Sequence, residues 1–140
     1  MLKPLVKFLC ATALTSAVLA QDLFIASPPP YTILLAGSQV TVQLVDKSPH
    51  NRADVWIGIE YCKSGSQCPD VLQDPGQILY TGPYTPGHHE DADYAYQNMT
   101  VTIPSSWPSG LAQLGAVMIW GLGAGQDDAA RVILDVVSSK

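Results

Sequence analysis

The feature that most constrains the fold of this chain is a strict alternation of side chains in residues 55–61. The segment reads Val-Trp-Ile-Gly-Ile-Glu-Tyr, so every second position holds a large apolar side chain. A period of two is typical of a β-strand that turns one face to a core and the other to solvent. β-branched and aromatic residues also suit a pleated surface. The segment is therefore predicted to be a half-buried strand.

Similar apolar segments recur along the chain, separated by turn residues. Residues 111–121 form the longest apolar run beyond residue 20 and have the length of a helix, but the glycines in and just after this run favour a strand. Proline and glycine clusters, such as 27–30 and 104–110, mark turns between the segments. The predicted strands are residues 21–26, 39–45, 55–61, 77–81, 94–103, 111–121 and 130–137.

Short strands with turn signals at fairly even spacing, and no amphipathic helix, predict an all-β chain. We expect a single antiparallel β-sandwich of immunoglobulin or fibronectin III type that occupies residues 21–140. Trp56 is the candidate for the tryptophan that such folds bury on their third strand. Residues 82–87 are expected to be irregular, because they contain two prolines.

Residues 1–20 have the pattern of a secretory signal peptide. Two lysines form a basic start, residues 8–19 are mostly apolar, and small residues at Val18 and Ala20 suit a cleavage site. The apolar part is short for a membrane span, and no later run of about 18 apolar residues occurs. The sequence predicts cleavage behind Ala20, secretion and no membrane span, with a retained anchor helix as the alternative.

Cleavage would also change the charge and the cysteine count. It would remove Lys3 and Lys7, so the formal net charge would go from −5 to −7. A chain this acidic is not attracted to nucleic acid or to anionic lipid surfaces. Loss of Cys10 would leave Cys62 and Cys68, and an even cysteine count in a secreted chain favours a disulfide over metal binding or catalysis. We therefore predict a disulfide between Cys62 and Cys68 and no nucleic-acid partner.

Residues 88–93 contain the densest group of candidate metal ligands, His88, His89 and Glu90 followed by two aspartates. Imidazoles and carboxylates together bind transition metals, and carboxylates bind calcium. Adjacent histidines point apart on an extended chain, however, and acidic loops are usually solvated. We expect a solvated loop tip and no cofactor, with a metal-dependent enzyme centred on the two histidines as the competing hypothesis.

The sequence offers no motif for catalysis. Serines and histidines are present, but a Gly-x-Ser-x-Gly elbow does not occur. Asp127 and Asp128 are paired carboxylates of the kind that can act on glycosides, yet they lie in a segment with the composition of a turn. We therefore expect a protein without enzymatic activity.

Asn98 begins the tripeptide Asn-Met-Thr, which is an acceptor for N-linked glycosylation. A glycan is bulky and polar, so the asparagine that carries it has to face solvent. In a secreted chain we expect Asn98 to carry a glycan at the surface of the domain.

Five aromatic residues lie near the proline-rich segments in the second half of the chain. Aromatic rings provide rigid contact area for a sugar or a peptide. They also bury much apolar area, so packing over the ends of the core is the preferred interpretation. The candidate binding surface consists of Tyr80, Tyr84, Tyr94, Tyr96 and Trp107.

Motifs in a fixed order run through most of the chain beyond residue 20. Residues 57–62 read Ile-Gly-Ile-Glu-Tyr-Cys, residues 68–69 read Cys-Pro, and residues 78–90 read Ile-Leu-Tyr-Thr-Gly-Pro-Tyr-Thr-Pro-Gly-His-His-Glu. Residues 96–104 read Tyr-Gln-Asn-Met-Thr-Val-Thr-Ile-Pro, and residues 110–114 read Gly-Leu-Ala-Gln-Leu. This ordered series resembles the fungal necrosis-inducing secreted protein (NIS) family of small effectors.

The resemblance implies an extracellular fungal protein with a β-sandwich that is secreted during contact with a plant. Members of the family suppress pattern-triggered immunity by binding host receptor-associated kinases, and some provoke cell death. They are not known as enzymes, and no catalytic residues are carried over; entry into host cells is a further implication. The expected function is that of an effector-like protein binder with a role in virulence. A carbohydrate-binding module associated with the fungal cell wall is the alternative.

Overall fold

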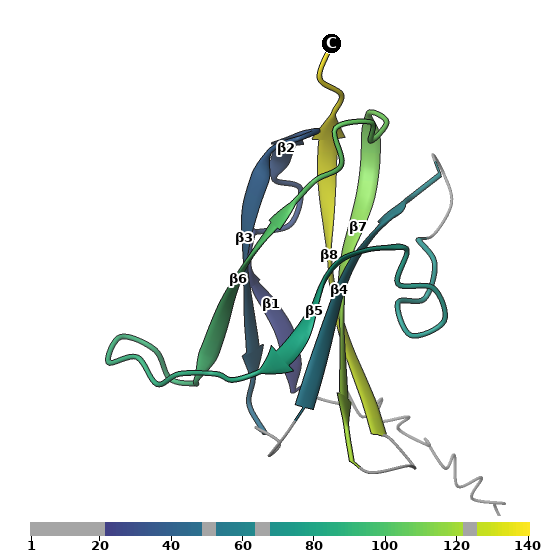
Figure 1. The fold of residues 1–140 in the computed structure, drawn as a ribbon. Helices are drawn as coiled ribbons and strands as arrows, with labels where there is room; N and C mark the ends of the chain where they lie inside the picture. The colour runs from purple at the N-terminus through teal and green to yellow at the C-terminus, as the bar shows by residue number, and fades with distance from the viewer. Residues whose placement is uncertain (1–21, 49–52, 64–67, 122–125) are drawn as a thin grey trace, which may run out of the picture.

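The computed structural model describes residues 22–48, 53–63, 68–121 and 126–140 (Figure 1). The predicted signal peptide, residues 1–20, lies outside these ranges. Within them, no helix is long and apolar enough to cross a membrane.

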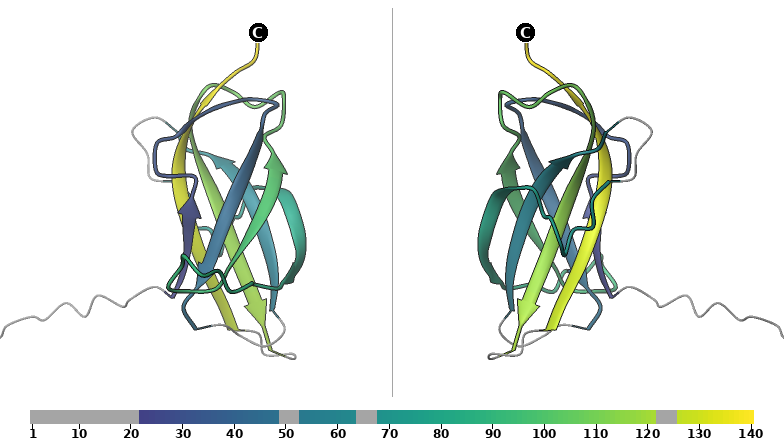
Figure 2. Two further views of the ribbon diagram at one scale, coloured as in Figure 1. Left: turned by 90° about the vertical axis from the view of Figure 1, so that its left-hand side faces the viewer. Right: turned by 90° about the vertical axis from the view of Figure 1, so that its right-hand side faces the viewer.

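Eight β-strands form two sheets in the described part of the chain (Figure 1). One sheet has three strands in the order β1–β3–β6, and the other has five in the order β2–β8–β7–β4–β5. The two sheets lie face to face, so in each side view the strands of one sheet lie in front of those of the other (Figure 2). The strands are β1 (Leu23–Ser27), β2 (Ile33–Leu35), β3 (Gln39–Asp46), β4 (Ala53–Tyr61), β5 (Gln77–Tyr84), β6 (Tyr96–Thr102), β7 (Gly110–Trp120) and β8 (Gln126–Val137).

The strand order is that of an immunoglobulin-like sandwich. Strands β4, β7 and β8 lie side by side in one sheet, and β3 pairs with β6 in the other, as strands C, F, G and strands B, E do in immunoglobulin folds. The consecutive strands β1 and β2 belong to different sheets. The predicted all-β sandwich is therefore confirmed. Its description as antiparallel is wrong for one pair, because β2 runs parallel to β8.

The core lies between the sheets and is built from alternate residues of each strand. Val55, Ile57 and Ile59 are fully buried, as their alternation predicts. Burial of one such side chain stabilises the fold by about 2 kcal/mol, so this layer accounts for much of the stability. The largest fully buried apolar side chains are Leu23, Leu44, Ile57, Ile59, Ile103, Leu114, Met118 and Leu134.

Three parts of the strand pattern differ from the prediction. Strand β8 begins at Gln126 instead of residue 130, so Asp127 and Asp128 pair with β7 and do not lie in the expected turn. Residues 33–35 form β2, although this apolar run shows no alternation of polar and apolar residues that would mark it as a strand. Strand β5 continues through residues 82–84, which were expected to be irregular. The proline at position 83 is tolerated because β5 is the edge of its sheet, where a missing amide hydrogen costs no ladder hydrogen bond on the open side.

Trp56 is not the buried core tryptophan that was expected. It lies between Val55 and Ile57, which are both fully buried, so the alternation of the strand turns its side chain outward. The indole is 42% exposed on the outer face of the five-stranded sheet. Trp107 and Trp120 are the tryptophans that pack against the core, and both are only partly buried.

Candidate protein-binding surface

The outer face of the five-stranded sheet is covered by the chain at its centre and exposed at its ends. The connection from β4 to β5 crosses this face (Figure 2, right). We call residues 68–76 of this connection the strap. The exposed Trp56 marks one end of the face, and β2 with the neighbouring ends of β7 and β8 forms the other.

The strap packs closely on the sheet because the strands beneath it carry glycine. Val71 is buried, and a β-carbon at Gly115 would lie only 2.6 Å from its Cγ1. A β-carbon at Gly58 would overlap the carbonyl oxygen of Pro75. Glycine in a strand interior often marks such a close approach of another segment. The strap thus occupies the space that side chains at these two positions would fill.

A buried glutamine fixes the start of the strap to the sheet. Gln113 of β7 is 1% exposed, and its Nε2 donates a hydrogen bond to the carbonyl oxygen of Pro69 at 2.8 Å. Its Oε1 accepts a hydrogen bond from Nη1 of Arg131 at 3.2 Å. Both ends of the amide are therefore satisfied, which removes the cost of burying it.

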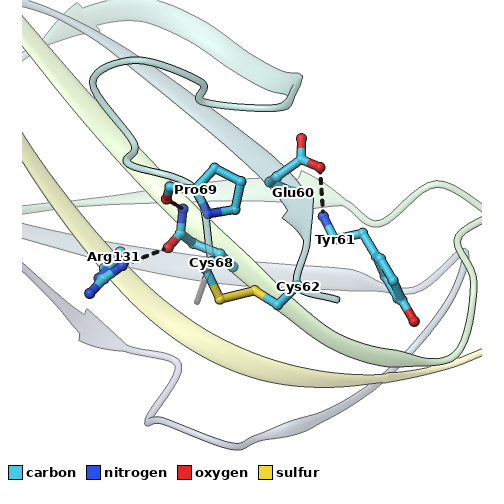
Figure 3. The surroundings of a disulfide bond; sticks show 7 residues. Glu60, Tyr61, Cys62, Cys68, Pro69 and Arg131 are labelled. Carbon is cyan, nitrogen blue, oxygen red and sulfur yellow. Dashed lines mark hydrogen bonds between the residues drawn. A yellow bond between two sulfur atoms is a disulfide. The ribbon is translucent and has the colours of Figure 1, made fainter. Parts of the chain in front are cut away.

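A disulfide joins Cys62 and Cys68 and ties the strap to the end of β4 (Figure 3). The Cys62 amide donates to the carbonyl oxygen of Leu111 at 2.9 Å, so the anchor point itself is held by β7. The predicted disulfide is thus present; residues 64–67 of the loop that it closes lie outside the described residues. At the other end of the strap, the Gly76 amide donates to Oδ1 of Asp74 at 3.0 Å, which closes a turn.

Exposed apolar side chains gather beside β2. Ile33 and Leu35 point outward, because Leu34 between them packs against the core. Ile33 is paired with Asp135 of β8, and Leu35 with Val137. Nine large apolar side chains are exposed in the described part of the chain, and five of them lie here. We call these five residues the β2 patch: Tyr31, Ile33, Leu35, Leu111 and Val137.

Tyr31, at the start of the β2 patch, combines a strained backbone with an exposed ring. Its φ angle is 62°, in the left-handed region that disfavours residues with a β-carbon. Its amide donates to the carbonyl oxygen of Ile133 at 2.6 Å, which holds the backbone against β8. The ring is 67% exposed, so core packing does not explain why a tyrosine occupies this position. Strained positions of this kind cluster at functional sites.

Three of the five aromatic residues predicted as a binding surface belong to the core. Tyr84 is 4% exposed, and its hydroxyl donates to the carbonyl oxygen of Leu44 at 3.2 Å. Its burial, and secondarily the negative charge of Asp46, raise the pKa of Tyr84 to about 12. Tyr80 and Trp107 are partly buried and pack against the core. The five residues therefore do not form one surface.

The other two, Tyr94 and Tyr96, lie near each other at one end of the three-stranded sheet. Tyr94 is exposed, and Nζ of Lys47 lies 5.7 Å from the centre of its ring and 5.4 Å from that of Phe24. The ring of Tyr96 stacks on the ring of His89, with 3.7 Å between the centroids. This small aromatic group carries one positive charge and is separate from the β2 patch.

His88, His89 and Glu90 lie exposed in the connection between β5 and β6. One imidazole is engaged with Tyr96, as just described. Among the residues that the structure describes, no three His, Cys, Asp or Glu side chains gather in a way that could hold a metal ion. The geometry of the loop therefore gives no support to a metal site.

Asn98 lies in β6 on the outer face of the three-stranded sheet. Its side chain is exposed, and its Oδ1 accepts a hydrogen bond from Nε2 of Gln43 at 3.4 Å. Thr100, the third residue of the acceptor tripeptide, is exposed on the same side. Asn98 thus meets the requirement for a glycan, and it lies on the opposite sheet from the β2 patch.

A cleft of about 520 Å³ lies between the strap and β8. Asp70 and Leu72 of the strap line one side, and Asp128 and Arg131 of β8 line the other. Arg131 is already hydrogen-bonded to the glutamine that holds the strap. We therefore interpret the cleft as the gap left where the strap crosses the sheet.

No family model matches the sequence, and no curated protein matches it. Among solved structures, the fibronectin(III)-like modules of Clostridium thermocellum CbhA are 15% identical, with 81% of this chain and 93% of that chain covered and a TM-score of 0.43. A chain of the complex of Dpr1 IG1 with DIP-eta IG1 is also 15% identical, with 84% and 98% covered and a TM-score of 0.34. These comparisons assign no family to this chain.

Proposed function

We propose that this chain is a secreted protein-binding domain and that the β2 patch is its binding surface. The observation that carries the proposal is the gathering of five exposed large apolar side chains beside one edge strand. Contiguous apolar surface on a soluble domain usually marks an interaction site, whereas single exposed apolar residues do not. A glycan on Asn98 would project from the other sheet and leave the patch accessible.

The resemblance to the NIS family suggests the partner. In this proposal the domain binds plant receptor-associated kinases, suppresses pattern-triggered immunity and has no enzymatic activity. The protein is cut behind Ala20 and acts outside the fungal cell or after entry into the host cell. The disulfide between Cys62 and Cys68 is consistent with an oxidising compartment.

Affinity purification from plant extract tests this function with a matched pair of variants. Ile33→Ser removes an apolar side chain from the β2 patch, and Leu72→Ser removes one from the strap that is also more than half exposed. We expect the wild type and Leu72→Ser to retain receptor-associated kinases, identified by mass spectrometry, and Ile33→Ser to lose them. Recovery of no such kinase by the wild type would refute the kinase partner. Equal recovery by Ile33→Ser would refute the β2 patch as the binding surface.

A carbohydrate-binding module associated with the fungal cell wall is the second candidate, and one observation favours it. Tyr94 presents an exposed ring beside Lys47 and Phe24, and aromatic rings can stack on sugars. Under this function the protein would sediment with chitin, β-glucan or cellulose, and Tyr94→Ala would reduce the bound fraction. A protein that stays in the supernatant with all three polysaccharides would exclude it.

A further inference from the structure

The β2 patch has a carboxylate at its centre. Asp135 of β8 is paired directly with Ile33 on one side and with Leu111 on the other. Its position in the strand turns it outward, because Leu134 and Val136 on either side are fully buried. Asp135 itself is half-buried. The patch is therefore an apolar surface with a single charge in the middle.

The Asp135 carboxylate forms no hydrogen bond or ion pair with any residue that the structure describes. The backbone of Asp135 takes part in the pairing of β8 with its neighbours, and its amide donates to the carbonyl oxygen of Thr32 at 3.0 Å. Arg131, four residues earlier on the same face of β8, is directed to Gln113 instead. Four residues of a strand span about 13 Å, which is beyond the reach of a direct ion pair from its bound position.

A partner that covers the β2 patch would remove water from the Asp135 carboxylate and would have to replace the lost hydrogen bonds. A purely apolar partner would dehydrate the carboxylate without offering a hydrogen-bond donor, and burial of an unpaired charge costs binding free energy. A partner that brings a Lys or Arg side chain would form a charge-assisted hydrogen bond in partly dehydrated surroundings. Asp135 therefore selects among apolar partners by charge.

A second copy of this chain does not fit. A two-fold contact centred on the patch would place Asp135 of one copy near Asp135 of the other, and like charges in an interface oppose association. The formal net charge, which cleavage behind Ala20 would make −7, adds to the repulsion. Accepting the proposed function, we infer that the partner presents a basic side chain surrounded by apolar side chains, and that this basic group pairs with Asp135.

Selection of peptides from a random 12-residue phage library on the immobilised protein tests the inference. We expect selected peptides to carry a Lys or Arg next to apolar residues and to compete with one another. Their synthetic versions should bind Asp135→Asn at least tenfold more weakly, measured by fluorescence polarisation. The control is Asp127→Asn, which removes an exposed carboxylate elsewhere on the chain and should change Kd by less than twofold. Melting curves of both variants check that they fold.

The outcomes separate this inference from the proposed function. If Ile33→Ser weakens peptide binding tenfold and Asp135→Asn leaves it unchanged, the β2 patch binds proteins but the charge selection is wrong. If neither variant affects binding, or no peptide is selected, both the patch and the inference are wrong. Sedimentation that shows a dimer for the wild type and a monomer for Ile33→Ser would make a second copy the occupant and would also overturn the inference.

Discussion

The centre and the β2 end of one sheet face show opposite ways of treating apolar surface. Under the strap, Gly58 and Gly115 carry no side chain, and the polar Gln113 is hydrogen-bonded through both its Nε2 and its Oε1. At the β2 end, Ile33 and Leu35 are 69% and 52% exposed. The sheet carries glycine where the strap covers it. It carries large apolar side chains at the β2 end, where no described residue covers it. In the proposed function, another molecule covers the β2 end.

The largest effect should come from adding one methyl group under the strap. Gly58→Ala places a β-carbon against the carbonyl oxygen of Pro75, and backbone cannot move away as a flexible side chain can. We expect a loss of about 3 kcal/mol of unfolding free energy, measured by urea denaturation. A loss below about 1 kcal/mol would show that the strap does not press on the sheet. Peptide binding at the β2 patch should be unchanged under conditions where the variant is folded.

Removing the disulfide should weaken the covered centre less. The double variant Cys62→Ser/Cys68→Ser opens a loop with a sequence separation of 6, for which the chain-entropy model gives about 2 kcal/mol. The fold should persist, because the core does not depend on this link. Faster cleavage of the strap by a protease should accompany the loss, and a variant that fails to fold would contradict this view of the disulfide.

The backbone of Tyr31 should give a smaller effect at the β2 end. Tyr31→Ala keeps a β-carbon at a φ angle of 62°, whereas Tyr31→Gly removes it. We expect the glycine variant to be more stable than the alanine variant by about 1 kcal/mol in urea denaturation. Equal stability would mean that this backbone position is not strained and that its conformation gives no reason to assign Tyr31 a function.

The sequence predicted most of the fold, because its strands alternate. Residues 39–45 and 55–61 lie within β3 and β4, and the run at 111–121 is β7 shifted by one residue. Strand β2 could not be predicted, since a three-residue apolar run carries no period. The inward position of Trp56 was also a wrong prediction. The alternation of the strand places Trp56 on the outer face. The expectation of burial came from the usual position of a tryptophan in immunoglobulin-like folds.

The candidate surface was less predictable than the fold. Tyr31, Leu111 and Val137 are far apart in the sequence, and only the pairing of β2 with β8 and of β8 with β7 brings them together. The strap did leave a signal, because Gly58 and Gly115 interrupt the interiors of two predicted strands, and interior glycine often marks a close approach. The five aromatic residues of the predicted binding surface lie close together in the sequence, but the fold divides them between the two sheets and the connections at their ends.

One substitution made at two valines tests the division of this face most directly. Val71→Ser lies in the strap, where the valine is 5% exposed, and Val137→Ser lies in the β2 patch, where it is 44% exposed. We predict a loss of about 2 kcal/mol of unfolding free energy for Val71→Ser and less than about 0.5 kcal/mol for Val137→Ser, measured by urea denaturation under identical conditions. Equal losses, or a larger loss for Val137→Ser, would contradict the account.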